Sequence, residues 1–155
     1  MKMMTVRKTS VFPASEKEVF KRLQKLKTLQ YIAYPLASFT PVDGNNKLIW
    51  KAGSKSSYKF KLFGFIPFGI HTIKVIHFGL NNGILTHEGN RHVPIWNHKI
   101  IIKRIDGKKT KYTDIVDIDA GWKTPFVYLY AVCFYTHRQK RWINLLKHKR
   151  VHKKY

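Results

Sequence analysis

The stretch TPFVYLYAVCFYTHRQKRWINLLK, residues 124–147, holds the longest uninterrupted helical pattern in the chain. Thr124-Pro125 is a favourable start, because proline's fixed φ suits the first helical position and its missing N–H is not needed there. No glycine and no further proline follows before Lys147, and cations near the end suit the negative pole of the helix. We therefore predict one terminal helix, roughly 36 Å long at 1.5 Å per residue.

The sequence before this helix predicts strands separated by turn residues. The first strand, residues 3–12, is rich in β-formers and stops at Pro13. Seven more candidates follow, bounded by Gly, Asn, Asp and Pro: residues 37–42, 47–52, 55–63, 70–78, 84–88, 95–105 and 110–119. Short strands with short connections predict an antiparallel meander.

Two shorter helices are expected between the first and second strands. Ser15 and Glu18 form a capping-box pattern, followed by apolar residues at helical spacing, which predicts a helix over residues 16–25. A second helical piece over residues 28–33 should end before Pro35. The order of elements predicts an α+β domain in which a curved antiparallel sheet meets a long C-terminal helix.

Two arrangements would bury the apolar face of such a sheet. The helix can pack flat and give a filled core, or the sheet can wrap the helix and leave a cavity. An aromatic content of 14% favours the cavity, because large rings line cavities well.

A length of 155 residues corresponds to one domain, which we place at residues 1–148, with a basic tail at 149–155. The single cysteine, Cys133, lies in an apolar run and is expected to be a buried small hydrophobe. No signal-peptide pattern opens the sequence, so we expect a cytoplasmic protein, peripheral at the membrane if it contacts one.

The charge is strongly basic, with 30 Lys and Arg against 8 Asp and Glu. Such a surface attracts anionic lipid headgroups or nucleic acid, although a compositional lysine bias would have the same appearance. No helix-turn-helix, zinc-finger or RNP pattern is present, which makes nucleic acid the less favoured partner.

Several short segments, taken in order, resemble the START/polyketide-cyclase/pollen-allergen (SRPBCC) superfamily, including its bacterial members. They are PASEKEVF at 13–20, Glu88-Gly89 with Arg91, Trp96-Asn97-His98, Tyr112-Thr113-Asp114 and FYTHRQKRW at 134–142. The resemblance implies the helix-grip fold, with about seven strands around the C-terminal helix and a cavity between them. It implies binding of lipids, polyketides or sterols, but no single activity, because the superfamily contains carriers, cyclases and hydrolases.

Four polar residues are expected to form one patch on two neighbouring strands. Trp96 and His98 share one strand face, and Tyr112 and Asp114 share another, across the short Asp106-Gly107 turn. The patch could perform acid–base chemistry on a polyketide-like substrate, or it could be a structural hydrogen-bonded cluster. No nucleophile elbow or paired-carboxylate pattern accompanies it.

The long helix presents a stripe of residues at helical spacing: Tyr128, Ala131, Tyr135, Arg138 and Trp142. If the stripe faces the sheet, Tyr135 and Arg138 reach the cavity, where an arginine can clamp a carboxylate or phosphate. Arg138 could equally point outward. We expect Trp96, Tyr112, Tyr128 and Tyr135 to border one concave space.

Apolar rings occur where polar turn residues are usual, in Phe63, Phe65, Ile66 and Phe68. Flanking lysines would suit a loop that docks on an anionic membrane, whereas the alternative is a lid over the cavity.

The histidines near Glu88 do not predict a metal site. His87 and Glu88 are adjacent on a strand and point to opposite faces, and the spacing to His92 and His98 is not that of ligands. We interpret these as polar groups at strand ends and expect no metal or cofactor.

Three functions remain open from the sequence. The first is binding, for transport or sensing, of a hydrophobic small molecule such as a lipid or polyketide-like compound. The second is a cyclase-, aromatase- or hydrolase-like enzyme that uses the same cavity. The third is a charge-driven nucleic-acid-binding protein.

Overall fold

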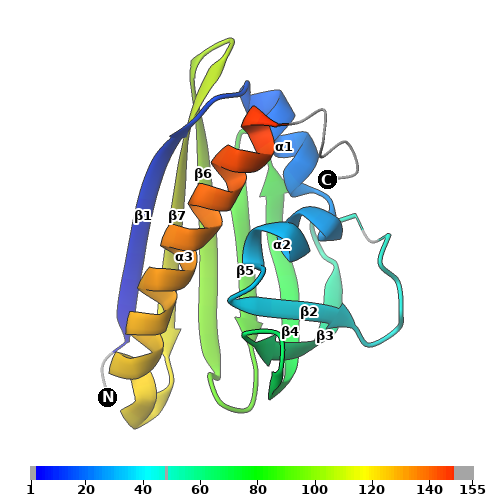
Figure 1. Ribbon diagram of the computed structural model, residues 1–155, viewed down its shortest axis with the longest axis vertical. Helices are drawn as coiled ribbons and strands as arrows, with labels where there is room; N and C mark the ends of the chain where they lie inside the picture. Colours follow the sequence, from blue (N-terminus) through cyan, green and yellow to red (C-terminus); the bar gives the residue numbers. More distant parts are fainter. Residues whose placement is uncertain (1–2, 48, 149–155) are drawn as a thin grey trace.

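The computed structural model describes residues 3–47 and 49–148; the expected basic tail, 149–155, lies outside the described residues. A seven-stranded antiparallel sheet bends around a long C-terminal helix (Figure 1). The elements in chain order are β1 (Met4–Phe12), α1 (Glu16–Leu23), α2 (Leu26–Ala33), β2 (Ala37–Pro41), β3 (Lys55–Leu62), β4 (Ile66–Gly79), β5 (Gly83–Gly89), β6 (Ile95–Asp106), β7 (Lys109–Asp119), the 3-10 turn η1 (Gly121–Lys123) and α3 (Thr124–Lys147). The expected α+β architecture and the bounds of the long helix are confirmed.

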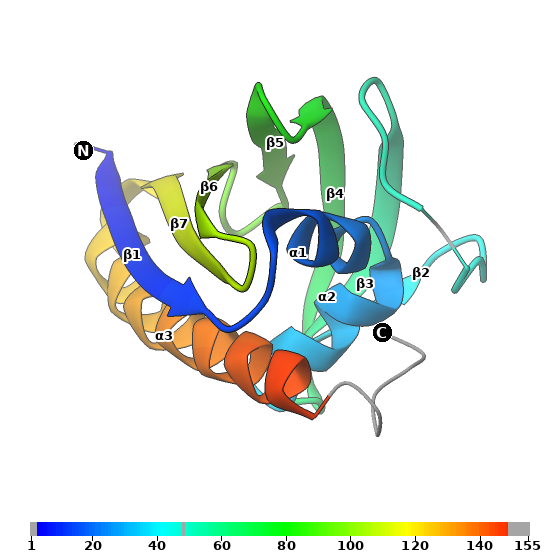
Figure 2. The same cartoon turned by 90° about the horizontal axis from the view of Figure 1, so that it is seen from above.

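The strands lie in the order β1-β7-β6-β5-β4-β3-β2, so the first strand closes against the last. Thr9 of β1 pairs with Thr113 of β7, and the remaining pairs are sequential hairpins. Viewed from above, the sheet bends into a U, and α3 lies along its open side (Figure 2). The concave face of the sheet is therefore turned toward the helices.

The helical hairpin before β2 follows from its caps. The Ser15 hydroxyl accepts a hydrogen bond from the Glu18 amide at 3.2 Å, which fixes the start of α1 as expected. The helix ends at Leu23, earlier than expected, because Lys25 adopts an extended conformation and becomes the N-cap of α2. The second helix consequently begins at Leu26.

The prediction of a strand at residues 47–52 is wrong, because the described residues of that stretch form no strand. Asp43 and Asn45 accept hydrogen bonds from backbone amides two residues ahead and hold a loop after β2. The chain then crosses to the junction of α1 and α2, where the Trp50 amide donates to the Gln24 carbonyl at 2.7 Å. The apolar alternation of this stretch thus corresponds to a loop that buries Trp50 in the core, although Trp50 pairs with no strand of the sheet.

The C-terminal half of α3 packs into a filled core. The ring of Phe12 stacks on Tyr112 at 4.5 Å and on Trp142 at 5.5 Å between centroids, and all three side chains are fully buried. Leu145 completes this cluster against α1 and the sheet. Dense aromatic packing thus anchors one end of the helix.

Cys133 was expected to be buried, and that prediction is wrong. The thiol is exposed on the outer face of α3. The helix covers the sheet with one face only, and a residue two positions before the buried Tyr135 falls on the opposite side.

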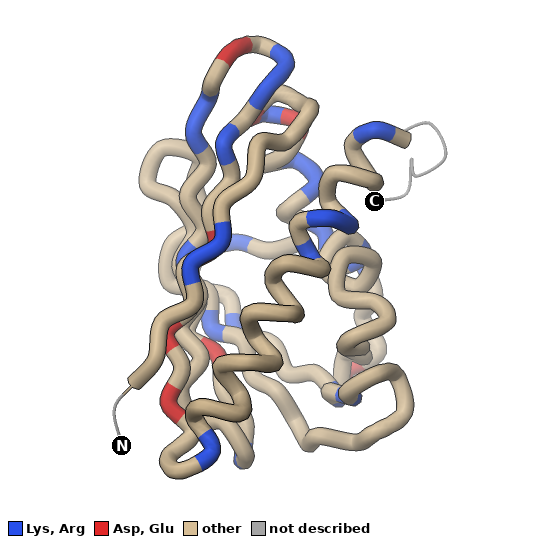
Figure 3. Tube along the Cα trace, turned by 60° about the vertical axis from the view of Figure 1, so that its left-hand side comes forward, with Lys and Arg blue, Asp and Glu red and all other residues tan. Residues whose placement is uncertain are grey.

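Positive charge is distributed unevenly along the molecule. Lys and Arg are concentrated on the β6–β7 hairpin and in the C-terminal half of α3 (Figure 3). In contrast, residues 124–137, the first half of α3, contain no Lys or Arg. At the start of α3, cations that a polyanion could meet therefore come from neighbouring segments, such as Lys123 of η1, and not from the helix itself.

Candidate functional site

A cavity of about 410 Å³ lies between the concave face of the sheet, α2 and α3. Phe60, Ile73 and Val75 form part of the sheet wall, and Val127 and Phe134 come from α3. The volume falls within the range typical of small-molecule sites, which are mostly apolar with a few placed polar groups. The arrangement with a hollow core, expected from the aromatic content, is the one observed.

One end of the cavity opens to solvent between η1, the start of α3 and the β3–β4 hairpin. Trp122 and Phe126 line the cavity, yet they are 74% and 68% exposed, so they stand at its mouth. Phe68 and Val93 contribute from the opposite side. Because α3 carries these rings at its start, the mouth lies at the end of the helix that lacks Lys and Arg.

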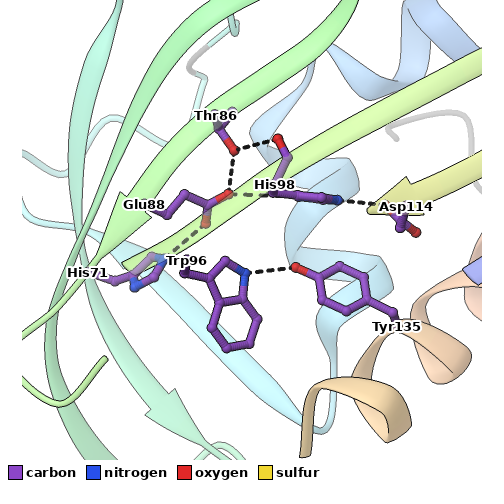
Figure 4. Close-up of polar contacts among 7 residues, drawn as sticks. All are labelled: His71, Thr86, Glu88, Trp96, His98, Asp114 and Tyr135. Carbon is purple, nitrogen blue, oxygen red and sulfur yellow. Dashed lines mark hydrogen bonds and ion pairs between the residues drawn. The ribbon is translucent and has the colours of Figure 1, made fainter. Parts of the chain in front are cut away.

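A polar wall crosses the otherwise apolar cavity on β4, β5 and β6 (Figure 4). The Glu88 carboxylate accepts hydrogen bonds from His71 Nε2 at 2.9 Å and from the Thr86 hydroxyl at 2.6 Å. The side-chain amide nitrogen of Asn90 lies 3.3 Å from His71 Nδ1. Because this amide nitrogen can only donate, Nδ1 is the acceptor and the ring proton is on Nε2. Glu88 is thus held as an ionised acceptor although its side chain is only 11% exposed.

The wall continues outward from the cavity through a second histidine. His98 Nε2 lies 2.6 Å from Asp114 Oδ1, and its Nδ1 faces Glu88 at 3.7 Å. Asp114 also accepts a hydrogen bond from the Gln139 amide on α3 at 2.9 Å. These contacts tie β5, β6, β7 and α3 together across the core.

The pKa values of this wall are shifted by partners that outweigh burial. Burial alone would raise the pKa of Glu88, but the hydrogen bond from His71 and the proximity of both His71 and His98 bring it well below its ordinary value. Burial alone would lower the pKa of His98, but the hydrogen bond to Asp114 and the nearby Glu88 carboxylate raise it above the ordinary value of 6.5. The site therefore favours a charged imidazole between two carboxylates.

Two α3 side chains face this wall. Tyr135 Oη accepts a hydrogen bond from the Trp96 indole at 2.9 Å (Figure 4). Arg138 is 5% exposed and lines the cavity, so of the two orientations left open by the sequence it takes the inward one.

The structure brings together some of the expected site residues and not others. Trp96, His98, Tyr135 and Arg138 line the cavity. The lining does not include Tyr112, Asp114 or Tyr128, so the expectation that Tyr112 and Tyr128 border it is wrong. Tyr112 belongs to the filled core beside Phe12, and Asp114 reaches the cavity only through His98. Tyr128 is half-buried and packs beside the cavity cluster.

The prediction that the helical stripe borders the cavity is wrong at Tyr128, because α3 crosses the sheet obliquely (Figure 1). Near its start the cavity is lined by Val127, Tyr130 and Phe134, one residue out of phase with the stripe. The stripe meets the cavity only at Tyr135 and Arg138. Residue spacing shows which side chains share a face of a helix, but it does not show which face borders a cavity.

Sequence reasoning also missed residues at the wall and the mouth. Glu88 was interpreted only as a polar group at a strand end, whereas its side chain is largely buried in the wall. His71 could have been found, because it is in phase with the buried Ile73 and Val75 of β4. Trp122 gave no comparable pattern.

The apolar loop between β3 and β4 is shorter than expected, since β4 already begins at Ile66. The Phe65 amide donates to the Leu62 carbonyl across Phe63 and Gly64, both at positive φ as in a type I′ turn. Phe63, Phe65 and Ile66 are exposed. A register shift between Lys59 and Lys61 lies opposite Gly69 (φ 87), and Phe68 beside it turns toward the cavity.

The remaining candidate residues lie apart from this wall. His87 is exposed on the outer face, and His92 stacks on Phe68 at 4.6 Å. Within residues 3–47 and 49–148, no group of three or more His, Cys, Asp or Glu is arranged to hold a metal ion.

Comparisons with known proteins show the fold. No family model and no curated protein matches the sequence. Among solved structures, a START superfamily protein from Mycobacterium smegmatis matches with a TM-score of 0.65 at 17% identity, covering 92% of this chain and 97% of that one. A Chromobacterium violaceum protein gives 0.71 at 12%, covering 92% and 96%, and a Streptomyces aromatase/cyclase gives 0.62 at 10%, covering 94% and 92%.

The chain therefore has the helix-grip fold of SRPBCC-like proteins, as its sequence motifs suggested. Identities this low establish the architecture and do not transfer an activity. Within the part of the chain that the structure describes, no helix is long and apolar enough to span a membrane.

Proposed function

We propose that this protein binds a hydrophobic small molecule, such as a lipid or polyketide-like compound, in the cavity between the sheet and α3, for transport or sensing. The observation that carries the proposal is the cavity itself, about 410 Å³ in volume, apolar on most sides and open at one end. Burial of an apolar ligand there would gain about 25 cal/mol for each Å² removed from water. The ligand-binding and cyclase families that share the fold support the same use.

Filling the cavity tests this proposal. Ile73 lines the cavity, whereas Ile70 of the same strand is 49% exposed and does not line it. In titrations with an apolar fluorescent naphthylamine probe, Ile73→Trp should weaken binding by at least about tenfold, which is 1.4 kcal/mol. Ile70→Trp, the matched control, should bind as the wild type does. Equal binding by both variants, or no binding by the folded wild type, would contradict the proposal.

The rings around the mouth suggest how such a ligand would be exchanged. Phe65 and Trp122 are each 74% exposed, and Trp122 and Phe126 also line the cavity. Aromatic rings partition into the membrane–water interface. Lys123 directly follows Trp122, and Lys61 lies four residues before Phe65, so cations that could meet anionic headgroups accompany both rings. We propose that this end of the molecule rests on an anionic bilayer, so that the cavity opens toward the lipid.

Vesicle flotation tests the membrane contact. The double variant Phe65→Ser with Trp122→Ser should lose binding to phosphatidylserine-containing vesicles. The control, Ile105→Ser, removes an apolar side chain that is 51% exposed at the β6–β7 hairpin and should bind normally. Loss of binding in the control only, or equal binding of all three proteins, would contradict the proposal.

The polar wall favours a second candidate function, acid–base catalysis on the bound molecule. Glu88 and His98 both line the cavity, and Asp114 orients His98 through the 2.6 Å contact. Mass spectrometry of ligand recovered from the wild type and from Glu88→Gln tests this role. A product formed only by the wild type supports catalysis, whereas the same unchanged ligand from both excludes it.

A further inference from the structure

Arg138 is a buried cation at the inner end of the cavity. Its side chain is 5% exposed, and it is the lining residue of α3 that lies farthest from Trp122 at the mouth. No ion pair joins it to a carboxylate among the described residues, and its buried Nε has no hydrogen-bond partner there. Burying a charge that no ion pair balances costs free energy, so the position of Arg138 opposite the wall needs an explanation.

The carboxylates nearest to Arg138 are committed to other donors. Asp114 accepts from His98 and Gln139, and Glu88 accepts from His71 and Thr86. Burial alone would lower the pKa of Arg138, but electrostatic interactions with Tyr135 and with the carboxylates of Asp114 and Glu88 outweigh burial and raise that pKa, so the guanidinium stays charged. Neither carboxylate accepts a hydrogen bond from the N–H groups of Arg138.

Aromatic rings hold the guanidinium in place. Its central carbon lies 5.0 Å from the centroid of the Tyr135 ring and 5.5 Å from that of Phe134. Stacking of this kind uses the face of the guanidinium and leaves the N–H edge available.

Tyr135 of α3 offers a second donor that faces the same wall. In the contact with Trp96, Tyr135 Oη is the acceptor, because an indole nitrogen can only donate. The hydroxyl proton of Tyr135 has no recorded acceptor among the described residues. Arg138 and Tyr135 thus offer donors at the closed end of an apolar cavity.

Resting on the proposed function, we infer that the ligand is an amphipathic anion, a long-chain carboxylic acid, whose carboxylate is bound by Arg138 and Tyr135. Its hydrocarbon part would follow α3 toward Phe126 at the mouth. These positions are twelve residues apart, about 18 Å along the helix, which suits an extended chain. Arginine's fork matches the two oxygens of a carboxylate, and the low dielectric of the cavity strengthens the pair.

Two matched probes test the inference: cis-parinaric acid, a fluorescent long-chain polyene acid, and its methyl ester. They share the hydrocarbon part and differ in the charge. The wild type should bind the acid at least about tenfold more tightly than the ester, a difference of 1.4 kcal/mol. Arg138→Met should lose this preference while binding the ester as the wild type does. Lys140→Met, which removes an exposed cation two residues away, should keep it.

The outcomes separate this inference from the function on which it rests. Equal binding of acid and ester by the wild type, or a preference that survives in Arg138→Met, overturns the anionic ligand and leaves apolar binding intact. Failure of the folded wild type to bind either probe overturns both. If Arg138→Met does not fold, Arg138→Lys keeps the charge without the fork and should reduce the preference, and the wild-type comparison of acid and ester remains decisive.

Discussion

The two halves of α3 meet the same sheet in different ways. Near its C-terminal end, Trp142 stacks on Phe12 and packs at a tilt against Tyr112, and all three side chains are fully buried. Toward its start, Tyr130 and Phe134 border the cavity of about 410 Å³. One helix therefore closes a filled core at one end and covers a hollow at the other.

The difference shows how a domain can contain a cavity and still hold its long helix in place. Stacked rings fix the helix on the sheet at the closed end, with the dense packing usual for protein interiors. At the hollow end, hydrogen bonds replace part of that packing, for example between Trp96 and Tyr135. The helix position is secured at the filled end, so the other end can remain open to a ligand.

Removing the central ring of the filled half should have the largest effect. Trp142→Ala deletes a fully buried side chain that stacks on Phe12 and packs against Tyr112. We expect a loss of about 3–5 kcal/mol in the free energy of unfolding, measured by urea denaturation, because both transfer energy and a new void contribute. A loss below about 1 kcal/mol would remove the claim that this half anchors the helix.

Adding volume should separate the two halves. Val19 is 0% exposed in the filled cluster, and Val75 is 1% exposed beside the cavity. Val19→Phe should destabilise by about 1–3 kcal/mol through overpacking, whereas Val75→Phe should cost less than about 1 kcal/mol because its ring has space. Equal losses in denaturation experiments would contradict the contrast between the halves.

The polar wall should make the hollow half sensitive to pH. The pKa of His98 is raised above 6.5 in the folded protein, so its stabilising contribution is complete below that pH and is lost as pH rises through the folded-state value. The wild type should exceed His98→Gln in stability by about 1 kcal/mol at low pH, the worth of one hydrogen bond, and by less at high pH. Denaturation at several pH values checks this; an advantage that grows with pH would contradict it.

The outer face of α3 should contribute least to stability. Cys133 is exposed there, so Cys133→Ser should change the free energy of unfolding by less than about 0.5 kcal/mol. The wild type should react with a thiol reagent without unfolding, and the variant should not react. A wild-type thiol that reacts only in denaturant would show that the helix is covered on this side.

The sequence predicted elements better than contacts. Thr124-Pro125 and the absence of later breakers predicted α3 at its observed bounds, because these features act within the helix itself. The false strand at residues 47–52 and the misplaced Tyr128 both required knowing what lies opposite each segment. Glu88 was missed for the same reason, since its partners lie on other strands and are distant in sequence.

Apart from the false strand at residues 47–52, the amino-acid sequence by itself determined the order of helices and strands, the antiparallel meander and the strongly basic composition, because propensity, alternation and turn residues are local properties. Only the tertiary structure decided which rings fill the core and which border a hollow, that Arg138 points inward and that Cys133 points outward. The physical reason is that the curvature of the sheet and the oblique crossing of α3 set the distance between facing side chains, and that distance is not encoded in any one segment.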